Sequence, residues 1–397
     1  MKITFVIPYF YPAWQYGGQP RSAFELARAL VRRGHSVEVL TTDSIGDARL
    51  PGMTGRSVTQ NVEGIQVTYY RNLSNTLAYR QRLFWPSGFF AEIRKRLQGR
   101  DIVHIHELRS FLTVAAARAA HDLRVPYVIS THGGLRHLGK KTAKILFDRL
   151  WGDKIAKRAS TVLALSSVEE TDARAFGIDP KKIRRLPNPV DITEFEKLPN
   201  RQGFRDRWKL GNGKVVLFLG RLHWIKGADL LLQAFQGSHT LFPELRLVMA
   251  GPDDGQEAQL QRMATEMSLE SAVRFTGHLG PLERIEAFVA SDVTVVPSRS
   301  EVFALTAVES LMCGTPVLLS SVCGLEPQPG TDEGTVFFKT EDAQDLKEKL
   351  LMMIASEQFR DNAAHGRDFV VRHFSADAVA AKAELIYEGV IQVAGKR

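Results

Sequence analysis

The chain has 397 residues, more than one hydrophobic core usually organises, so its length predicts two domains. Hydrophobic residues make up 44% of the sequence and charged residues 24%, a balance that excludes a disordered, collagen-like or disulfide-rich protein. A formal net charge of +8 indicates an anionic partner, and charge alone leaves open a phosphate-bearing ligand, an acidic membrane or a nucleic acid.

The first half of the chain alternates short β-branched or aromatic segments with amphipathic ones. This alternation is typical of a parallel sheet with helices on both faces. A first strand at residues 3–7 leads through a glycine-bearing loop to a helix that starts at Pro20 and stops at Gly34. Further strands are expected at residues 37–40, 65–70, 102–105, 127–130 and 161–165.

A polar stretch from Asn188 to Gly213 interrupts the alternation and is the predicted linker. The predicted fold is α/β, with two Rossmann-like doubly wound domains facing a central cleft. The N-terminal domain is expected at residues 1–195 and the C-terminal domain at 205–375, with a last helix at 376–397 whose apolar stripe packs back on the N-terminal domain. The strands of the second domain are expected at residues 215–219, 245–249, 272–275, 293–296 and 316–319.

Neither a membrane span nor a signal peptide is predicted. No apolar run approaches the roughly 20 residues needed to cross a bilayer, and the run from Lys2 to Phe10 contains Pro8 and leads to no small-residue cleavage site. The expected location is the cytoplasm. Cys313 and Cys323 have no Cys or His neighbours at zinc-ligand spacing, so both are expected to be reduced and structural.

Open parallel sheets bind ligands at the carboxyl ends of their strands, so the loops after strands are searched first. The first loop contains Gly17-Gly18-Gln19-Pro20-Arg21. Its glycines lack Cβ atoms and let backbone amides approach a phosphate, to which the helix N-terminus adds partial positive charge. The loop is neither a G-x-G-x-x-G fingerprint nor a P-loop, and a plain turn with a surface arginine stays an alternative.

Two histidines lie near the end of one predicted strand. Alternation sends His104 and His106 to the same face, but two histidines without a third ligand do not predict a metal site. His106, at the carboxyl end, is predicted to contact a sugar hydroxyl or the reacting centre, whereas His104 is expected to be structural. His132 follows the next strand and would enter the same cleft.

A basic loop follows the first strand of the second domain. Arg221 and Lys226 in this loop suit a diphosphate whose negative charge grows as a glycosidic bond breaks, a role often given to Mg²⁺. Exposed Arg and Lys side chains are common, so Arg221 or Lys226 alone could equally be a surface residue without a ligand.

A later loop carries the strongest signal. Glu301 precedes a helix that bears Glu309 about two turns onward. Backbone amides at the start of this helix would face a phosphate, and a carboxylate can accept both hydroxyls of a ribose. The alternatives are a helix-dipole role for Glu301, a solvated Glu309, or a glycosidase pair, which would explain neither the basic loop nor the helix start. The amides expected at the phosphate are those of Phe303, Ala304 and Leu305.

In this order, the motifs resemble those of the retaining GT-B glycosyltransferases of family 4, over nearly the full chain. The resemblance implies that Gly17 and Gly18 bind the donor, that Arg221 and Lys226 hold its diphosphate, and that no metal ion or cofactor is required. The motifs that carry it are Gly17-Gly18-x-x-Arg21, His106, Gly220-Arg221 with Lys226-Gly227, and Glu301-x7-Glu309 before Cys313-Gly314-Thr315-Pro316-Val317.

The resemblance also implies a reaction. Glu301 contacts the transferred sugar, Glu309 the ribose and His106 the reaction zone, while Arg21 and His132 lie on the acceptor side. A hexosyl group would pass from a UDP- or GDP-sugar to a polysaccharide or lipid-linked acceptor by front-face transfer with retention.

Two departures from the family pattern keep a second hypothesis open. The chain has Glu301-Val302-Phe303-Ala304 where the family usually has Glu-Gly/Ser-Phe-Gly, and Pro189 where it usually has glycine. A non-catalytic nucleotide-sugar-binding subunit is therefore the alternative, against which Glu301 and Lys226 speak. A nicotinamide-dependent oxidoreductase is disfavoured because the G-x-G-x-x-G motif is missing.

Family members with lipid-linked acceptors often dock on membranes through the N-terminal domain. Two segments here interleave basic and bulky apolar residues, a pattern that suits binding to an anionic membrane surface. The predicted location is therefore the cytoplasm, either free or at the periphery of the inner face of the membrane. Solvated helices packed on the core remain the alternative, and no motif supports nucleic acid as a partner. The segments are Arg80, Arg82, Phe84, Trp85, Phe89, Phe90, Arg94, Lys95 and Arg96, and Arg136, Lys140, Lys141, Lys144, Leu146, Phe147, Arg149, Trp151, Lys154, Lys157 and Arg158.

Overall fold

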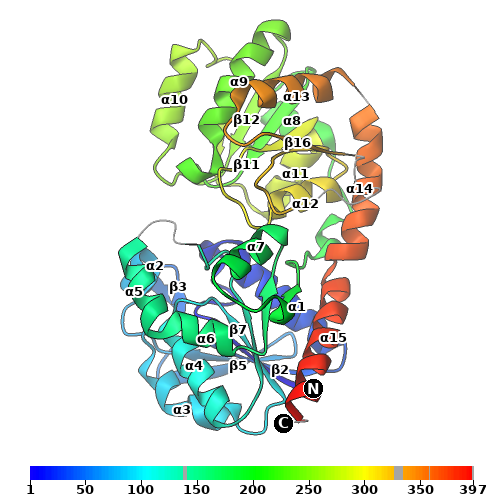
Figure 1. Ribbon diagram of the computed structural model, residues 1–397. Coiled ribbons are helices and arrows are strands. Elements are labelled where there is room, and N and C mark those ends of the chain that lie inside the picture. The colour runs from blue at the N-terminus through cyan, green and yellow to red at the C-terminus, as the bar shows by residue number, and fades with distance from the viewer. Residues whose placement is uncertain (137–140, 326–333, 357, 396–397) are drawn as a thin grey trace. The chain divides into compact units, whose positions relative to one another are not determined.

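The computed structural model describes residues 1–136, 141–325, 334–356 and 358–395. The chain divides into two compact units (Figure 1). Unit 1 comprises Met1–Pro189 and Ala376–Arg397, and unit 2 comprises Val190–Ser375. The last helix thus belongs to the first unit, of which Lys396 and Arg397 lie outside the described residues.

Within the described residues, unit 1 has an eight-stranded sheet in the order β10-β9-β8-β7-β1-β2-β6-β5. All neighbouring strands are parallel except β5 and β6. The strands are β1 (Lys2–Val6), β2 (Ser36–Thr42), β5 (Ser57–Val62), β6 (Ile65–Tyr70), β7 (Ile102–His106), β8 (Tyr127–Ser130), β9 (Thr161–Ala164) and β10 (Ile183–Arg185), with β3 (Ser44–Ile45) and β4 (Ala48–Arg49) as a separate pair.

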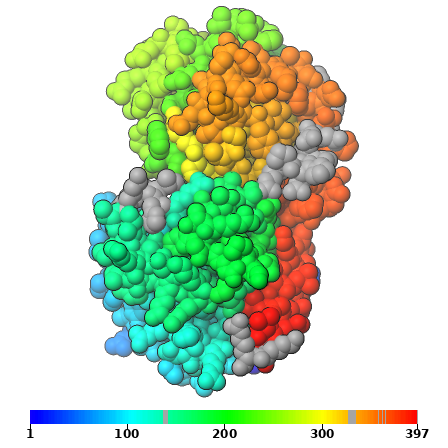
Figure 2. Space-filling model, in the orientation of Figure 1, coloured from blue at the N-terminus to red at the C-terminus, as the bar shows by residue number. Residues whose placement is uncertain are grey.

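Helices cover both faces of this sheet because successive side chains of a strand point to opposite faces. Ile3 and Phe5 pack in a cluster with α1 and α15, whereas Val6 packs in a second cluster with α3 and α4. In Figure 2, α15 runs in red along the surface of unit 1. The helices are α1 (Gly18–Arg32), α2 (Asn75–Gln81), α3 (Ser87–Leu97), α4 (Phe111–Asp122), α5 (Lys141–Phe147), α6 (Asp153–Arg158), α7 (Ser167–Ala175) and α15 (Ala376–Gly395), with a π-helical turn at Asp148–Gly152 between α5 and α6.

Unit 2 has a parallel sheet in the order β13-β12-β11-β14-β15-β16, the order of a doubly wound Rossmann sheet. Its strands are β11 (Val215–Leu219), β12 (Arg246–Ala250), β13 (Val273–Gly277), β14 (Val293–Val296), β15 (Val317–Ser320) and β16 (Thr335–Phe338). Its helices are α8 (Arg201–Arg207), α9 (Ala228–Leu241), α10 (Glu257–Glu266), α11 (Pro281–Ala290), α12 (Leu305–Met312), α13 (Ala343–Ala355) and α14 (Gln358–Phe374).

Each sheet has one place where the direction of strand addition reverses. In unit 1 this switch point lies between β1 and β7, and in unit 2 between β11 and β14. Connections leave a switch point toward opposite sides, so the loops at the carboxyl ends of these strands open a crevice for ligands. The two pairs of loops are therefore the places where a site is built.

The predicted α/β class is confirmed, and every predicted strand is present. Reasoning from the sequence missed β3, β4, β5, β10 and β16, which are short or lie at sheet edges, where exposure weakens the hydrophobic pattern. The chain passes to unit 2 at Val190, before the boundary expected at residue 195. The predicted linker also contains α8, which is part of unit 2.

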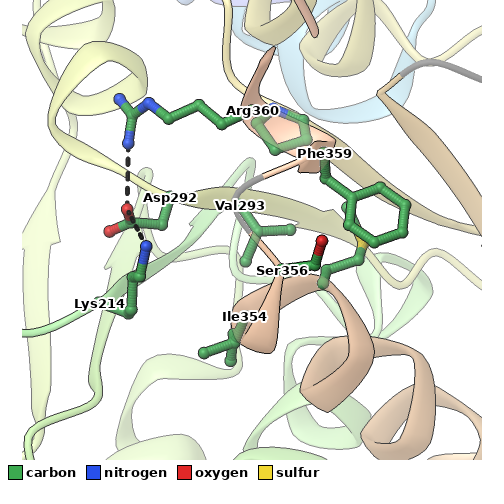
Figure 3. Close-up of a pocket in the computed structure, with 9 residues that line it drawn as sticks. Lys214, Asp292, Val293, Ile354, Ser356, Phe359 and Arg360 are labelled. Atoms are coloured by element: carbon green, nitrogen blue, oxygen red, sulfur yellow. Dashed lines mark hydrogen bonds and ion pairs between the residues drawn. The ribbon is translucent and has the colours of Figure 1, made fainter. Parts of the chain in front are cut away.

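A mostly buried carboxylate explains why α8 belongs to unit 2. Asp292, at the amino end of β14, accepts from Arg205 (2.9 Å) and Arg201 (2.7 Å) of α8 and from Arg360 (3.0 Å) of α14, with Lys214 at 3.7 Å. Two basic residues of the predicted linker, Arg201 and Arg205, thus tie α8 to the sheet of unit 2. Figure 3 shows Lys214 and Arg360 reaching Asp292 from two sides of a small cavity. The cavity lies at the amino ends of the strands, opposite to the switch-point loops at their carboxyl ends.

Candidate functional site

In unit 2 the loops after β11 and β14 are packed against each other at a glycine. Gly227 has φ +68°, and a Cβ there would lie 2.0 Å from the Pro297 carbonyl oxygen. Only glycine permits both this backbone conformation and this approach. The contact brings the basic loop beside the segment that leads to Glu301.

Lys226 and Glu301 form an ion pair across these loops. The exposed fractions of their side chains, 25% and 17%, leave both groups accessible to a ligand. Arg221, the other predicted cation, is exposed and pairs with Asp254 in the loop after β12. The structure thus joins Lys226 and Glu301 directly, whereas Arg221, in the same loop as Lys226, pairs with the loop after the neighbouring strand.

The start of α12 lies against the end of β11, since the Thr306 hydroxyl donates to the Leu219 carbonyl oxygen (3.3 Å). Phe303 and Ala304 are buried just ahead of the helix, and Ala304 is its N-cap. The Leu305 amide donates to the Phe303 carbonyl oxygen (3.0 Å), so this amide is engaged within the loop rather than free as expected.

Glu309 has a partner that the sequence did not indicate. Arg284 of α11 pairs with Glu309 and also with Glu194 (2.7 Å), forming a chain of three charged side chains. Glu309 is therefore a mostly buried, ion-paired carboxylate, which excludes the simple solvated residue.

In unit 1, the glycine loop after β1 leads into α1. Gly17 has φ +97°, a left-handed conformation that favours glycine, and the helix begins at Gly18. Arg21 lies in the first turn of this helix, with its guanidinium 5.8 Å from the centre of the Trp14 ring. Gly17 and Arg21 thus lie at the N-terminal end of α1, as the sequence predicted.

The three histidines form one stacked group at the end of β7. His106 and His132 lie 3.1 Å apart through Nδ1 and Nε2, and the rings of His104 and His106 stack with centres 4.0 Å apart. Burial, with the neighbouring rings, holds the pKa of His106 well below its usual value and lowers the pKa of His132 to about 4. Both imidazoles are therefore neutral near pH 7. His104 bonds to Tyr387 (2.6 Å) and Ser130 (2.8 Å), which makes it structural.

A buried carboxylate fixes the His132 loop. Glu169 accepts from the Thr131 hydroxyl and the Gly133 amide, both at 2.6 Å, and from the Leu165 amide at 2.8 Å. These bonds hold the backbone on both sides of His132, which has φ +47°. Burial nevertheless raises the pKa of Glu169, because desolvation outweighs the bonds.

Glu107 is a candidate residue that the sequence analysis passed over. It directly follows His106, so its position at the strand end was the available signal. Burial raises the pKa of Glu107 to about 7, although Arg82, Tyr9, Arg109 and Lys144 lower it. A carboxylate that titrates near neutrality at a switch point is typical of a functional site.

Two absences concern the described residues alone. They contain no group of three His, Cys, Asp or Glu side chains placed to hold a metal ion. In the same part of the chain, no helix is both long enough and apolar enough to cross a membrane.

Comparison with known proteins agrees with this geometry. Residues 16–194 match Glycosyltransferase Family 4, and residues 200–366 match Glycosyl transferases group 1. The chain belongs to the group 1 glycosyltransferases. A D-inositol 3-phosphate glycosyltransferase of Xylanimonas cellulosilytica is 27% identical over 384 residues, which cover 92% of this chain and 90% of the relative.

Solved structures confirm the GT-B fold of this glycosyltransferase. HepE of Anabaena in complex with UDP superposes with a TM-score of 0.77 at 19% identity, covering 98% of this chain and 100% of HepE. The complex of HepE with UDP-glucose has a TM-score of 0.75 at 21% identity and the same coverage.

Proposed function

We propose that this glycosyltransferase transfers a hexose from a UDP-sugar, with retention and without a metal ion, to a hydroxyl of a polysaccharide or lipid-linked acceptor. The proposal rests above all on the Lys226–Glu301 pair at the switch point of unit 2, next to the start of α12. A cation and an anion held together there suit a ligand with a diphosphate and a hydroxyl-bearing sugar.

Each residue has a role in this proposal. Arg221 and Lys226 bind the diphosphate, together with amides at the start of α12, and Glu301 accepts hydroxyls of the donor sugar. Glu309 accepts the ribose hydroxyls, and Arg284 holds it in place. Gly17, Gly18, Arg21, His106 and His132 are assigned to the unit 1 side of the reaction.

The bond between the anomeric carbon and the β-phosphate oxygen breaks as the acceptor oxygen attacks from the same face. The acceptor proton passes to the leaving phosphate, and the negative charge that grows on the diphosphate is stabilised by Lys226 and Arg221. The neutral state of His106 fits a role in hydrogen bonding to a hydroxyl.

The relatives favour UDP over GDP. HepE was solved with UDP and with UDP-glucose, and the bacterial relative is named for an inositol phosphate acceptor. A polyhydroxylated acceptor is compatible with the polar residues after β1 and β7.

A panel of UDP-, GDP-, ADP- and dTDP-sugars, incubated with the pure protein and EDTA, tests the donor and the metal independence. Binding and slow hydrolysis of a UDP-sugar are expected. Binding without turnover, even with polyol acceptors added, would favour the non-catalytic subunit. No binding of any nucleotide sugar would overturn the site.

We further propose that unit 1 docks on an anionic membrane surface. The two basic segments meet through Phe111, whose ring lies 4.9 Å from that of Trp85 and 5.9 Å from that of Trp151. The segment from α5 to α6 lies at the surface of unit 1 (Figure 2). Exposed apolar side chains lie on both segments: Leu83, Trp85, Ile145, Leu146, Leu150 and Trp151.

Some residues expected on that surface lie elsewhere. Phe84 and Phe89 are buried in the core of unit 1, and Arg82 covers the rings of Tyr9 and Tyr16. Lys140 lies outside the described residues. The apolar contact is therefore narrower than the sequence suggested.

Flotation with phosphatidylcholine vesicles, with and without phosphatidylglycerol, tests this docking. Binding is expected only with the anionic lipid and should fall in Leu146→Ser, whose native side chain is 59% exposed. Leu241→Ser in unit 2, where the native leucine is 61% exposed, is the control. Equal loss in both variants, or no lipid dependence, would refute the docking.

A further inference from the structure

Three buried polar atoms at the switch point of unit 1 have no hydrogen-bond partner among the described residues. They are Gln19 Nε2, His106 Nε2 and Glu107 Oε2. Gln19 follows β1, and His106 and Glu107 stand at the end of β7, the two strands between which the sheet reverses. Buried polar atoms are nearly always paired in folded proteins, so a group of unpaired ones at a switch point indicates a place for ligand atoms.

Tyr9 ties two of these residues together. Its hydroxyl donates to Gln19 Oε1 (2.7 Å), and it also interacts with the Glu107 carboxyl, whose pKa it lowers. The Tyr9 ring stacks on that of Tyr16 with centres 4.1 Å apart, and Arg82 lies over both rings. The phenol is thereby held in one place, and Gln19 and Glu107 converge on it.

The backbone of Glu107 is also fixed. Its φ of +76° lies in the left-handed region, which is costly for a residue with a side chain. The Glu107 amide donates to the Ser130 carbonyl oxygen (2.9 Å), and the Thr113 hydroxyl donates to the Glu107 carbonyl oxygen (2.7 Å). These bonds hold the strained residue, so the orientation of its carboxyl group is built into the fold.

The free atoms define the chemistry of the ligand. Glu107 Oε2 can accept a hydrogen bond, and Gln19 Nε2 can only donate one. A hydroxyl group does both, since its proton goes to the carboxylate and its lone pair accepts from the amide. A phosphate or a carboxylate carries a negative charge and would be repelled by an ionised Glu107.

We propose that Gln19 and Glu107 bind a non-reacting hydroxyl of the acceptor and so select an uncharged polyhydroxylated ring, a sugar or a cyclitol, at this position. The inference rests on the proposed transferase function, because it assigns the unit 1 site to the acceptor. Any phosphate or lipid carried by the acceptor then lies away from Glu107, and the adjacent His106 is placed for the hydroxyl that reacts.

Binding of small polyols to the full-length protein tests this subsite without any donor. The probes are myo-inositol and methyl α-D-glucopyranoside, with inorganic phosphate as the anionic comparison, followed by saturation-transfer NMR. Gln19→Leu and Glu107→Gln are expected to weaken polyol binding about tenfold each, since each leaves one hydrogen bond unmade or weaker. Glu63→Gln is the matched control, because Glu63 is an exposed glutamate of unit 1 that also has a positive φ, +51°.

Each outcome bears on the subsite alone. Polyol binding that weakens in both site variants and stays unchanged in Glu63→Gln supports it, provided that circular dichroism shows the variants folded. No polyol binding by the wild type, equal binding by all variants, or a preference for phosphate would overturn it. The donor panel tests the transferase function separately, so a failure of one experiment is distinguishable from a failure of the other.

Discussion

Replacing Glu107 by glutamine should stabilise unit 1 at alkaline pH. The folded protein raises the pKa of Glu107 from 4.5 to about 7, mainly by burial. Each pKa unit corresponds to about 1.4 kcal/mol, so the shift sets an upper limit of about 3.5 kcal/mol. Because the side chain keeps some exposure, solvent screening reduces this, and a gain of about 1–3 kcal/mol is expected.

The sign follows from proton binding. Between the unfolded pKa near 4.5 and the folded pKa near 7, the native state binds more protons than the unfolded state, so the contribution of Glu107 to stability falls as pH rises. Glutamine does not ionise. The variant and the wild type should therefore be nearly equal at about pH 4 and differ fully above about pH 8.

The assay must report on unit 1 alone, because a two-unit chain need not unfold in one step. Native-state hydrogen exchange of the β7 amides, at pH 5 and pH 8.5, provides such a local free energy. Glu63→Gln is again the control and should change little at either pH. An equal gain at both pH values, or none at pH 8.5, would refute the assignment of a desolvated, ionisable Glu107.

Three further predictions concern unit 2. Lys226→Ala or Glu301→Ala should lower the rate of sugar transfer at least ~100-fold while the protein stays folded. Near-normal rates in both variants would refute the assignment of these residues to the donor site. Gly227→Ala should destabilise unit 2 by about 2–4 kcal/mol in urea unfolding, because its Cβ meets a backbone carbonyl, whereas Gly211→Ala, with φ +67° and open space around it, should cost about 1 kcal/mol. Asp292→Ala should lower the free energy of unfolding of unit 2 by about 3–5 kcal/mol in the same measurement, because three arginines and Lys214 lose their shared carboxylate. A decrease below about 1 kcal/mol would contradict a stabilising role of Asp292.

The hydrophobic pattern located the central strands of both sheets because a strand buried on both faces leaves a continuous apolar run. Strands at sheet edges, such as β5 and β16, were not predicted. Each has only one neighbouring strand and is partly exposed to solvent, so its apolar run is interrupted. A different pattern led to the expectation that Phe84 and Phe89 lie at the surface. Their basic neighbours indicated a surface, but aromatic rings among charges pack inward as readily as outward, and here they complete the core.

Local sequence by itself indicated which loops are candidates for the site: glycines before a helix, a histidine at a strand end, cations in one loop and carboxylates around a helix start. It could not pair them, because Lys226 and Glu301 lie 75 residues apart and meet only where β11 and β14 become neighbours. The ion pair between Arg284 and Glu309 likewise depends on tertiary structure, because it forms only where α11 packs near α12. The unpartnered atoms of Gln19 and Glu107 exist only in the folded chain, since burial alone removes the water that would otherwise satisfy them.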